Sequence, residues 1–87
     1  MASVTVRVVN EADEIVLYPN PANNKVEIYM PLIDEVEVFN ALGMPLDRTK
    51  AKREVVELDV STYPTGVYIV HLRQLNNHYY KKLVIQH

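Results

Sequence analysis

The sequence contains no cysteine and no tryptophan, and only two of its 87 residues are glycine. The missing cysteines exclude disulfide bonds, thiol nucleophiles and thiolate metal sites. The scarcity of glycine excludes collagen-like and glycine-rich repeats. No apolar run approaches the roughly 20 residues of a membrane-spanning helix, so membrane insertion is not expected. A chain of this length must be held together by packing around one modest core.

An excess of basic residues is also missing. Nine Lys and Arg oppose eleven Asp and Glu, which gives a net charge of −2. Because nucleic-acid binders normally carry an excess of positive charge, no nucleic-acid partner is expected. His71, His78 and His87 lack metal-ligand spacing, and no serine motif, carboxylate pair or phosphate-binding loop stands out. We therefore expect no catalytic residue, no metal and no cofactor.

Alternation of apolar and polar residues is the strongest pattern in the sequence. Val26, Ile28 and Met30, for example, alternate with Glu27 and Tyr29. A period of two places each set on one face of a strand, as in antiparallel sheets with one buried side. The strands predicted in this way cover residues 4–9, 15–18, 25–30, 35–39, 44–48, 54–59, 67–74 and 79–86. They indicate an all-β fold, an Ig-like antiparallel β-sandwich of about seven short strands.

Segments rich in proline, asparagine or charge separate these strands. Pro19-Asn20-Pro21-Ala22-Asn23 predicts a rigid turn, since proline has no backbone donor. Gly43 is expected to supply a positive φ at the end of a turn, and the charged residues 47–53 are expected in an exposed loop. Asn76-Asn77 predicts a two-residue hairpin turn. That turn would give the cross-strand pairs Tyr68–Ile85 and Val70–Leu83.

Four segments also occur in a characteristic order. They are Tyr18-Pro19-Asn20-Pro21-Ala22-Asn23, Val36-Glu37-Val38-Phe39-Asn40-Ala41-Leu42-Gly43, Gly66-Val67-Tyr68 and, near the end of the sequence, Lys81-Lys82-Leu83-Val84. Each segment is common by itself, but their order and spacing are together specific. In this respect the sequence resembles the C-terminal sorting domain of the type IX secretion system of Bacteroidetes. The resemblance covers about residues 14–87, and residues 1–13 are assigned to a strand and linker of a parent protein. One departure is Asn24, where many members carry Gly or Asp.

The resemblance implies an Ig-like sandwich that serves as an export signal. Outer-membrane translocon components would recognise the domain and carry a folded cargo from the periplasm to the outer membrane, the cell surface or the exterior. A sortase-like protease would then remove the domain, and the cargo would be joined to surface lipopolysaccharide. By their place in the motifs, the recognition residues would be Gly66, Tyr68, Lys81, Lys82, Leu83 and Val84. The structural turn motif would comprise Pro19, Asn20, Pro21 and Asn23.

Other interpretations of the same residues stay open. An adhesive or carbohydrate-binding Ig-like module would need an exposed aromatic platform, for which the candidates are Tyr18, Tyr29, Tyr63, Tyr79 and Tyr80. A structural spacer could form a homodimer through an exposed edge strand that bears Ile69 and Val84. The motif residues also have simple structural roles: a rigid turn, a core tyrosine, or lysines that solvate a strand.

Overall fold

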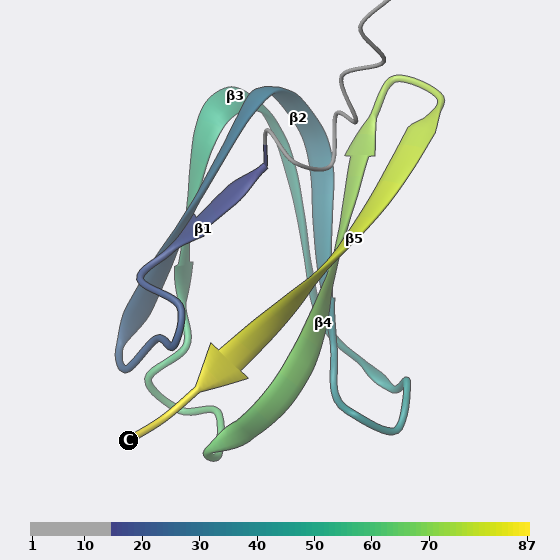
Figure 1. The fold of residues 1–87 in the computed structure, drawn as a ribbon. Helices are drawn as coiled ribbons and strands as arrows, with labels where there is room; N and C mark the ends of the chain where they lie inside the picture. The colour runs from purple at the N-terminus through teal and green to yellow at the C-terminus, as the bar shows by residue number, and fades with distance from the viewer. Residues whose placement is uncertain (1–14) are drawn as a thin grey trace, which may run out of the picture.

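The computed structural model describes residues 15–87, apart from the side chains of residues 52 and 53. Five strands follow one another: β1 (Val16–Tyr18), β2 (Lys25–Phe39), β3 (Pro45–Asp59), β4 (Gly66–Gln74) and β5 (Asn77–Ile85) (Figure 1). Every strand pair is antiparallel, which confirms the predicted all-β antiparallel fold. The strand predicted at 4–9 lies outside the described residues. Within residues 15–87, no helix is long and apolar enough to cross a membrane.

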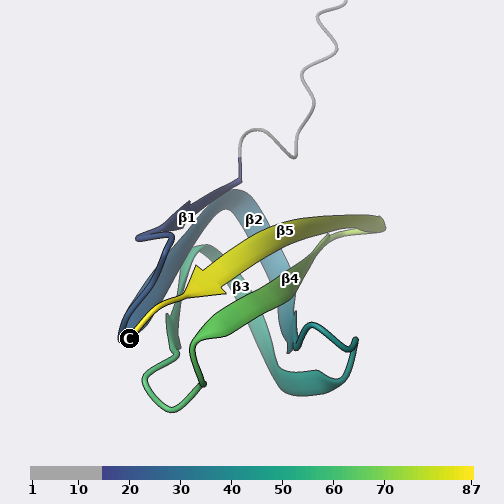
Figure 2. The same ribbon diagram turned by 60° about the horizontal axis from the view of Figure 1, so that its bottom comes forward.

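One hydrogen-bonded sheet curls over itself to form the two layers of the sandwich (Figures 1 and 2). The first layer joins β1 and the end of β3 to the beginning of β2. The second layer joins the beginning of β3 to the end of β2, followed by β4 and β5. Because β2 and β3 take part in both layers, the sandwich is closed along one side by continuous backbone.

The predicted strands at 25–30 and 35–39 are not separate elements but the two halves of β2. The register with β3 shifts between Tyr29 and Ile33 and again between Ile33 and Glu35. Pro31 lies in this stretch and cannot donate to the ladder, so the strand bends there without ending. The predicted segments at 44–48 and 54–59 are likewise the halves of β3, and the expected loop at 47–53 is wrong because it lies within that strand. Five elements thus contain the seven predicted segments.

Both layers contribute to a single hydrophobic core. Its members are Ile15, Leu17, Ala22, Val26, Ile28, Met30, Ile33, Val36, Val38, Val56, Leu58, Val60, Tyr68, Val70, Leu72, Leu83 and Ile85. Burial of a side chain the size of Val, Leu or Ile is worth about 1.5–3 kcal/mol, so this core is the main source of stability in a chain that has no disulfide. Among residues 15–87, Glu35 is the one charged residue that is buried, and its Oε2 atom lies 3.6 Å from the Nε atom of Arg48.

The turn between β2 and β3 is organised by one asparagine. The Asn40 side-chain oxygen accepts hydrogen bonds from the backbone N–H groups of Leu42 and Met44, both at 2.9 Å. Gly43 has a φ of 84°, which confirms the predicted positive φ. The turn leaves Leu42 largely exposed.

The hairpin turn between β4 and β5 is displaced from its predicted place. Gln74 pairs with Asn77, so the loop residues are Leu75 and Asn76, and the predicted pairing is wrong by two residues. Leu75 has a φ of 53°, and its N–H donates to the Asp34 carboxylate at 2.6 Å. This contact from β2 fixes a turn that the local sequence does not favour. A shift of two keeps each side chain on its predicted face of the sheet.

Candidate functional site at the last strand

The pairing of β4 with β5 brings the motif residues together. Gly66 lies opposite Ile85, Tyr68 opposite Leu83 and Val70 opposite Lys81. The segment Val36–Gly43 lies beside them, because its Phe39 in β2 is opposite Ile69 of β4. Three segments that are distant in sequence therefore meet at one end of the second layer, where β5 finishes (Figure 1).

Two of the predicted recognition residues point into the core. Leu83 is fully buried and Tyr68 nearly so. The Tyr68 hydroxyl donates to the Pro64 carbonyl at 2.5 Å, and its ring stacks on Tyr63 with 5.5 Å between ring centroids. A Cβ at Gly66 would meet only the Tyr68 ring, at 3.9 Å, so the structure does not explain why glycine is needed there. Tyr68 and Leu83 shape this end of the domain from within.

The outer side of the same strands carries exposed groups. We call Val67, Lys82 and Val84 the recognition face. Val67 lies opposite Val84, while Lys82 lies opposite Ile69. Val67 is 43% exposed, Val84 is half-buried and Lys82 is exposed. Lys81 lies opposite the buried Val70, so the two lysines are on opposite faces, as alternation predicts. The result is a small apolar strip with a cation beside it.

The proline-rich turn lies against the outer edge of β5. The Asn20 side chain donates to the Lys82 carbonyl at 3.0 Å and accepts from the Val84 N–H at 2.9 Å. The Ala22 N–H donates to the Val84 carbonyl, and its carbonyl accepts from the Gln86 N–H, both at 2.8 Å. Residues 20–22, which we call the edge clamp, thus act as a short parallel strand beside β5. Pro19 and Pro21 flank Asn20 and are exposed.

The last residue of the sequence is also held in place. The His87 Nδ1 atom lies 3.0 Å from the Asn23 side-chain oxygen, and Nε2 lies 2.6 Å from the Tyr63 carbonyl. The His87 N–H donates to the Thr65 hydroxyl at 3.1 Å. The roles of Ala22 and His87 in holding β5 were not predicted, because no local sequence signal reveals a contact between residues more than sixty positions apart.

Two histidines meet on the outer face of the second layer. His71 Nε2 lies 2.8 Å from His78 Nδ1, and Tyr80 stacks on His71 at 4.8 Å between ring centroids. His71 Nδ1 lies 3.9 Å from a Glu37 carboxylate oxygen. Burial, followed by the neighbouring His78, holds the pKa of His71 below its usual value, although Glu37 opposes this effect. Among residues 15–87, no group of three or more histidine or acidic side chains is arranged to hold a metal.

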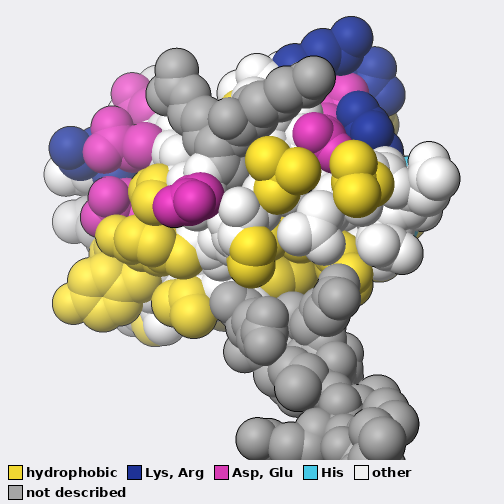
Figure 3. All heavy atoms as spheres, turned by 90° about the horizontal axis from the view of Figure 1, so that it is seen from above, with side chains coloured by type: hydrophobic (Ala, Val, Ile, Leu, Met, Phe, Trp, Pro, Cys, Tyr) yellow, Lys and Arg dark blue, Asp and Glu magenta, His cyan; other side chains and the backbone are white. Residues whose placement is uncertain are grey.

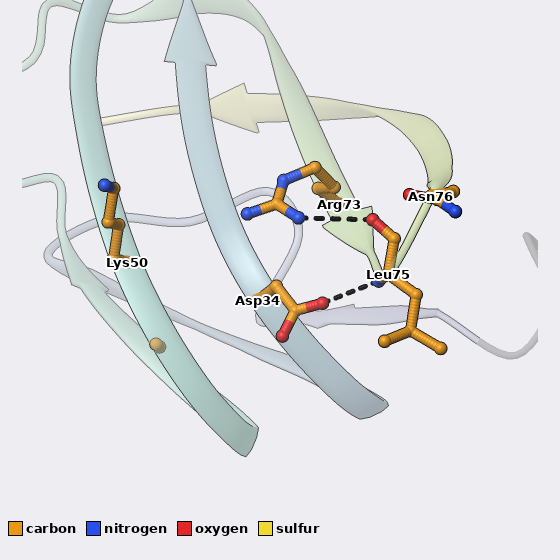
Figure 4. A pocket seen from close by; sticks show the side chains of 6 residues that line it. Asp34, Lys50, Arg73, Leu75 and Asn76 are labelled. Carbon is orange, nitrogen blue, oxygen red and sulfur yellow. Dashed lines mark hydrogen bonds between the residues drawn. The ribbon is translucent and has the colours of Figure 1, made fainter.

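A hollow of about 750 Å³ opens beside the tip of the β4–β5 hairpin. Figure 4 shows that Asp34 and Arg73 both point towards Leu75 while Lys50 lies apart. Asp34 accepts from the Leu75 N–H, and Arg73 donates to its carbonyl at 3.2 Å. These charged groups therefore hold the unusual turn and are not arranged as an acid–base pair.

The tyrosines proposed for sugar binding do not form one platform. Tyr18 and Tyr29 lie on the outer side of the first layer, where Tyr29 is opposite Val16. Tyr63 packs against the core and Tyr80 lies beside His71 in the second layer. Seen from the end where β2 and β3 bend, hydrophobic patches lie beside mixed groups of acidic and basic side chains (Figure 3). No continuous aromatic surface for a glycan is present in residues 15–87.

An Ig-like sandwich whose motif segments converge on its last strand defines a class of small β-sandwich modules. A family model described as the secretion system C-terminal sorting domain matches residues 16–86. The chain therefore belongs to this family of type IX secretion sorting domains, and it carries a signal for export across the outer membrane to the cell surface or the extracellular space.

Individual proteins of known function or structure are also similar to this chain. An endo-acting ulvan lyase of Formosa agariphila is 27% identical over 79 residues, which is 86% of this chain and 15% of the lyase. A solved structure of PorZ, a bacterial surface component of the type IX secretion system of Porphyromonas gingivalis, superposes with a TM-score of 0.76. That match has 18% identity and covers 94% of this chain and 13% of PorZ, so it supports the β-sandwich fold. The chain spans only a small part of either protein.

Proposed function

We propose that translocon components of the type IX secretion system recognise this domain through its recognition face, and so export the folded cargo attached to it. The observation that carries the proposal is the convergence of the motif segments at one end of β4 and β5. There, Val67 and Val84 offer apolar contact area and Lys82 a positive charge, on a rigid two-stranded support. Small exposed patches of this composition suit a transient protein interface.

The steps before and after recognition belong to the same proposal. The cargo would reach the translocon from the periplasm, and a sortase-like protease would remove the domain once the cargo is outside. Lipopolysaccharide would then anchor the cargo at the surface. Cleavage would fall within or before residues 10–14, the acidic stretch that precedes the sandwich. The family to which the chain belongs supports the export step, and the resemblance set out above implies the other steps.

The test is a reporter that is exported to the periplasm and carries residues 14–87 at its C-terminus. In a type IX-competent cell we expect the reporter outside the outer membrane, and in a translocon-deficient strain we expect it in the periplasm. A Lys82→Ala, Val84→Thr double variant should lower export by about tenfold, the effect of roughly 1.4 kcal/mol of lost binding.

The matched control is Lys50→Ala, which removes another exposed strand lysine far from the recognition face. Thermal melting must show that all variants fold. Periplasmic retention of the folded, unaltered fusion in the competent strain would refute the export function. Equal export by the double variant and the control would refute the role of the recognition face.

A further inference from the structure

The outer edge of β5 is divided into two parts. β5 ends the order of strands in the sheet, so β4 covers only one of its edges. The edge clamp covers the other edge near the end of β5, where it takes up the Lys82 carbonyl, both main-chain groups of Val84 and the Gln86 N–H. No segment of residues 15–87 pairs with the earlier part of this edge.

The earlier part of the edge presents main-chain groups in a regular row. Backbone N–H and C=O groups of alternate residues point to the same side of a strand. The pairing of β4 with β5 runs without a shift from Gly66–Ile85 to Gln74–Asn77, so this alternation is unbroken. Since Val84 turns its groups towards the edge clamp, Tyr80 and His78 turn theirs to the same side. We call residues His78–Lys82 the open edge; at its end, the Lys82 carbonyl already accepts from the Asn20 side chain.

The charged side chains of the open edge itself are all of one sign. The stretch contains histidine, tyrosine and lysine but no acidic residue. Lys82 is exposed and makes no ion pair within residues 15–87. The acidic residues of the same face, Glu35 and Glu37, lie on β2, where Arg48 lies within 4 Å of both. Acidic side chains on an added strand would therefore stabilise its pairing with the open edge.

We infer that the open edge is a docking site where an extended acidic segment of a partner protein adds to the sheet as a further strand. The edge clamp shows that this edge accepts an extended segment, and strand addition is a common mode of peptide recognition. A second copy of β5 fits less well, because it would bring lysine and histidine against lysine and histidine. The inference rests on the proposed function, which makes the partner a component of the export machinery.

The probe is a fluorescent peptide, Thr-Glu-Val-Glu-Val-Glu-Thr, titrated with the 87-residue chain and followed by anisotropy. Because the contact is small, we expect a dissociation constant of roughly 10 μM to 1 mM. A peptide with Lys in place of Glu should bind at least about tenfold more weakly. A peptide methylated on alternate backbone amides should not bind, since it cannot donate to the strand.

Two variants at one position separate the backbone from the side chain. Tyr80→Pro removes an N–H that faces the open edge and that β4 does not use. Tyr80→Ala removes the same ring but keeps the N–H. Binding should be lost in the proline variant and stay within about threefold in the alanine variant, whereas Lys82→Glu should weaken it by about fivefold or more.

Several results would overturn the inference. These are no binding at millimolar concentration, equal binding by the lysine or methylated peptide, or equal binding by the two Tyr80 variants when thermal melts show both folded. If the proline variant does not fold, the methylated peptide and the Lys82→Glu variant still test whether a strand adds to the open edge. Export of the reporter without peptide binding would remove the docking site and leave the proposed function intact. Peptide binding without export of the reporter would keep the docking site and refute the proposed export function.

Discussion

Replacing Asn20 tests whether the edge clamp holds β5. The Asn20→Ala variant loses two hydrogen bonds to the main chain of β5, at 2.9 and 3.0 Å. A net hydrogen bond contributes about 0.5–1.5 kcal/mol, and this side chain is exposed, so water replaces part of what is lost. We expect a loss of about 1–2 kcal/mol in the free energy of unfolding. For a domain of this size that is a fall in Tm of roughly 4–16 °C.

Thermal melting and hydrogen exchange of the backbone amides together provide the assay. The Val84 amide should exchange faster in the Asn20→Ala variant, whereas the Leu83 amide, which faces β4, should change little. Asn24→Ala is the matched control, because the Asn24 side chain makes no hydrogen bond within residues 15–87. If Asn20→Ala and Asn24→Ala had the same Tm and the same exchange at Val84, the assigned role of the edge clamp would be wrong.

Three further outcomes are expected. Leu83→Ala should lower the free energy of unfolding by about 2–5 kcal/mol in a urea titration, because it leaves a cavity at a fully buried site. A loss smaller than that caused by replacing an exposed valine with alanine would contradict this prediction. Leu75→Asn should raise the free energy of unfolding by up to about 1 kcal/mol, and with it the Tm, because asparagine tolerates a positive φ better than leucine. A fall in Tm would contradict this prediction. The depressed pKa of His71 favours the neutral ring in the fold, so stability should be full above about pH 6.5 and decline as the pH falls below it. In thermal melts between pH 7.5 and 5, the His71→Gln variant should lose less stability than the unaltered protein as the pH falls. If the two proteins lost stability equally, His71 would not be the cause of the decline.

The fold class could be predicted because alternation is a local signal. Val26 and Ile28 share a face whatever their partners are, and the same holds for Val36 and Val38. Where the alternation is interrupted, between residues 30 and 35, the sequence pattern predicted two strands. The structure shows a bend within β2, because hydrogen bonds to β3 continue on both sides of it.

The position of the last turn could not be predicted because a distant residue decides it. The Asn76-Asn77 pair is locally the better turn, yet Asp34 binds the Leu75 N–H from 41 positions away. The recognition residues show the same division between local and distant information. Alternation placed Lys81 and Lys82 on opposite faces correctly, whereas the contact of Asn20 with β5 depends on how the two layers close.

The parallel contact between Ala22 and Ile85 also has a mechanical consequence. The edge clamp lies near the start of the described chain and β5 near its end, so a pull on the two ends would slide these segments along each other. Their hydrogen bonds would then be loaded together rather than one at a time. The domain should resist stretching between its ends more strongly than the peeling of β5 from its last residue.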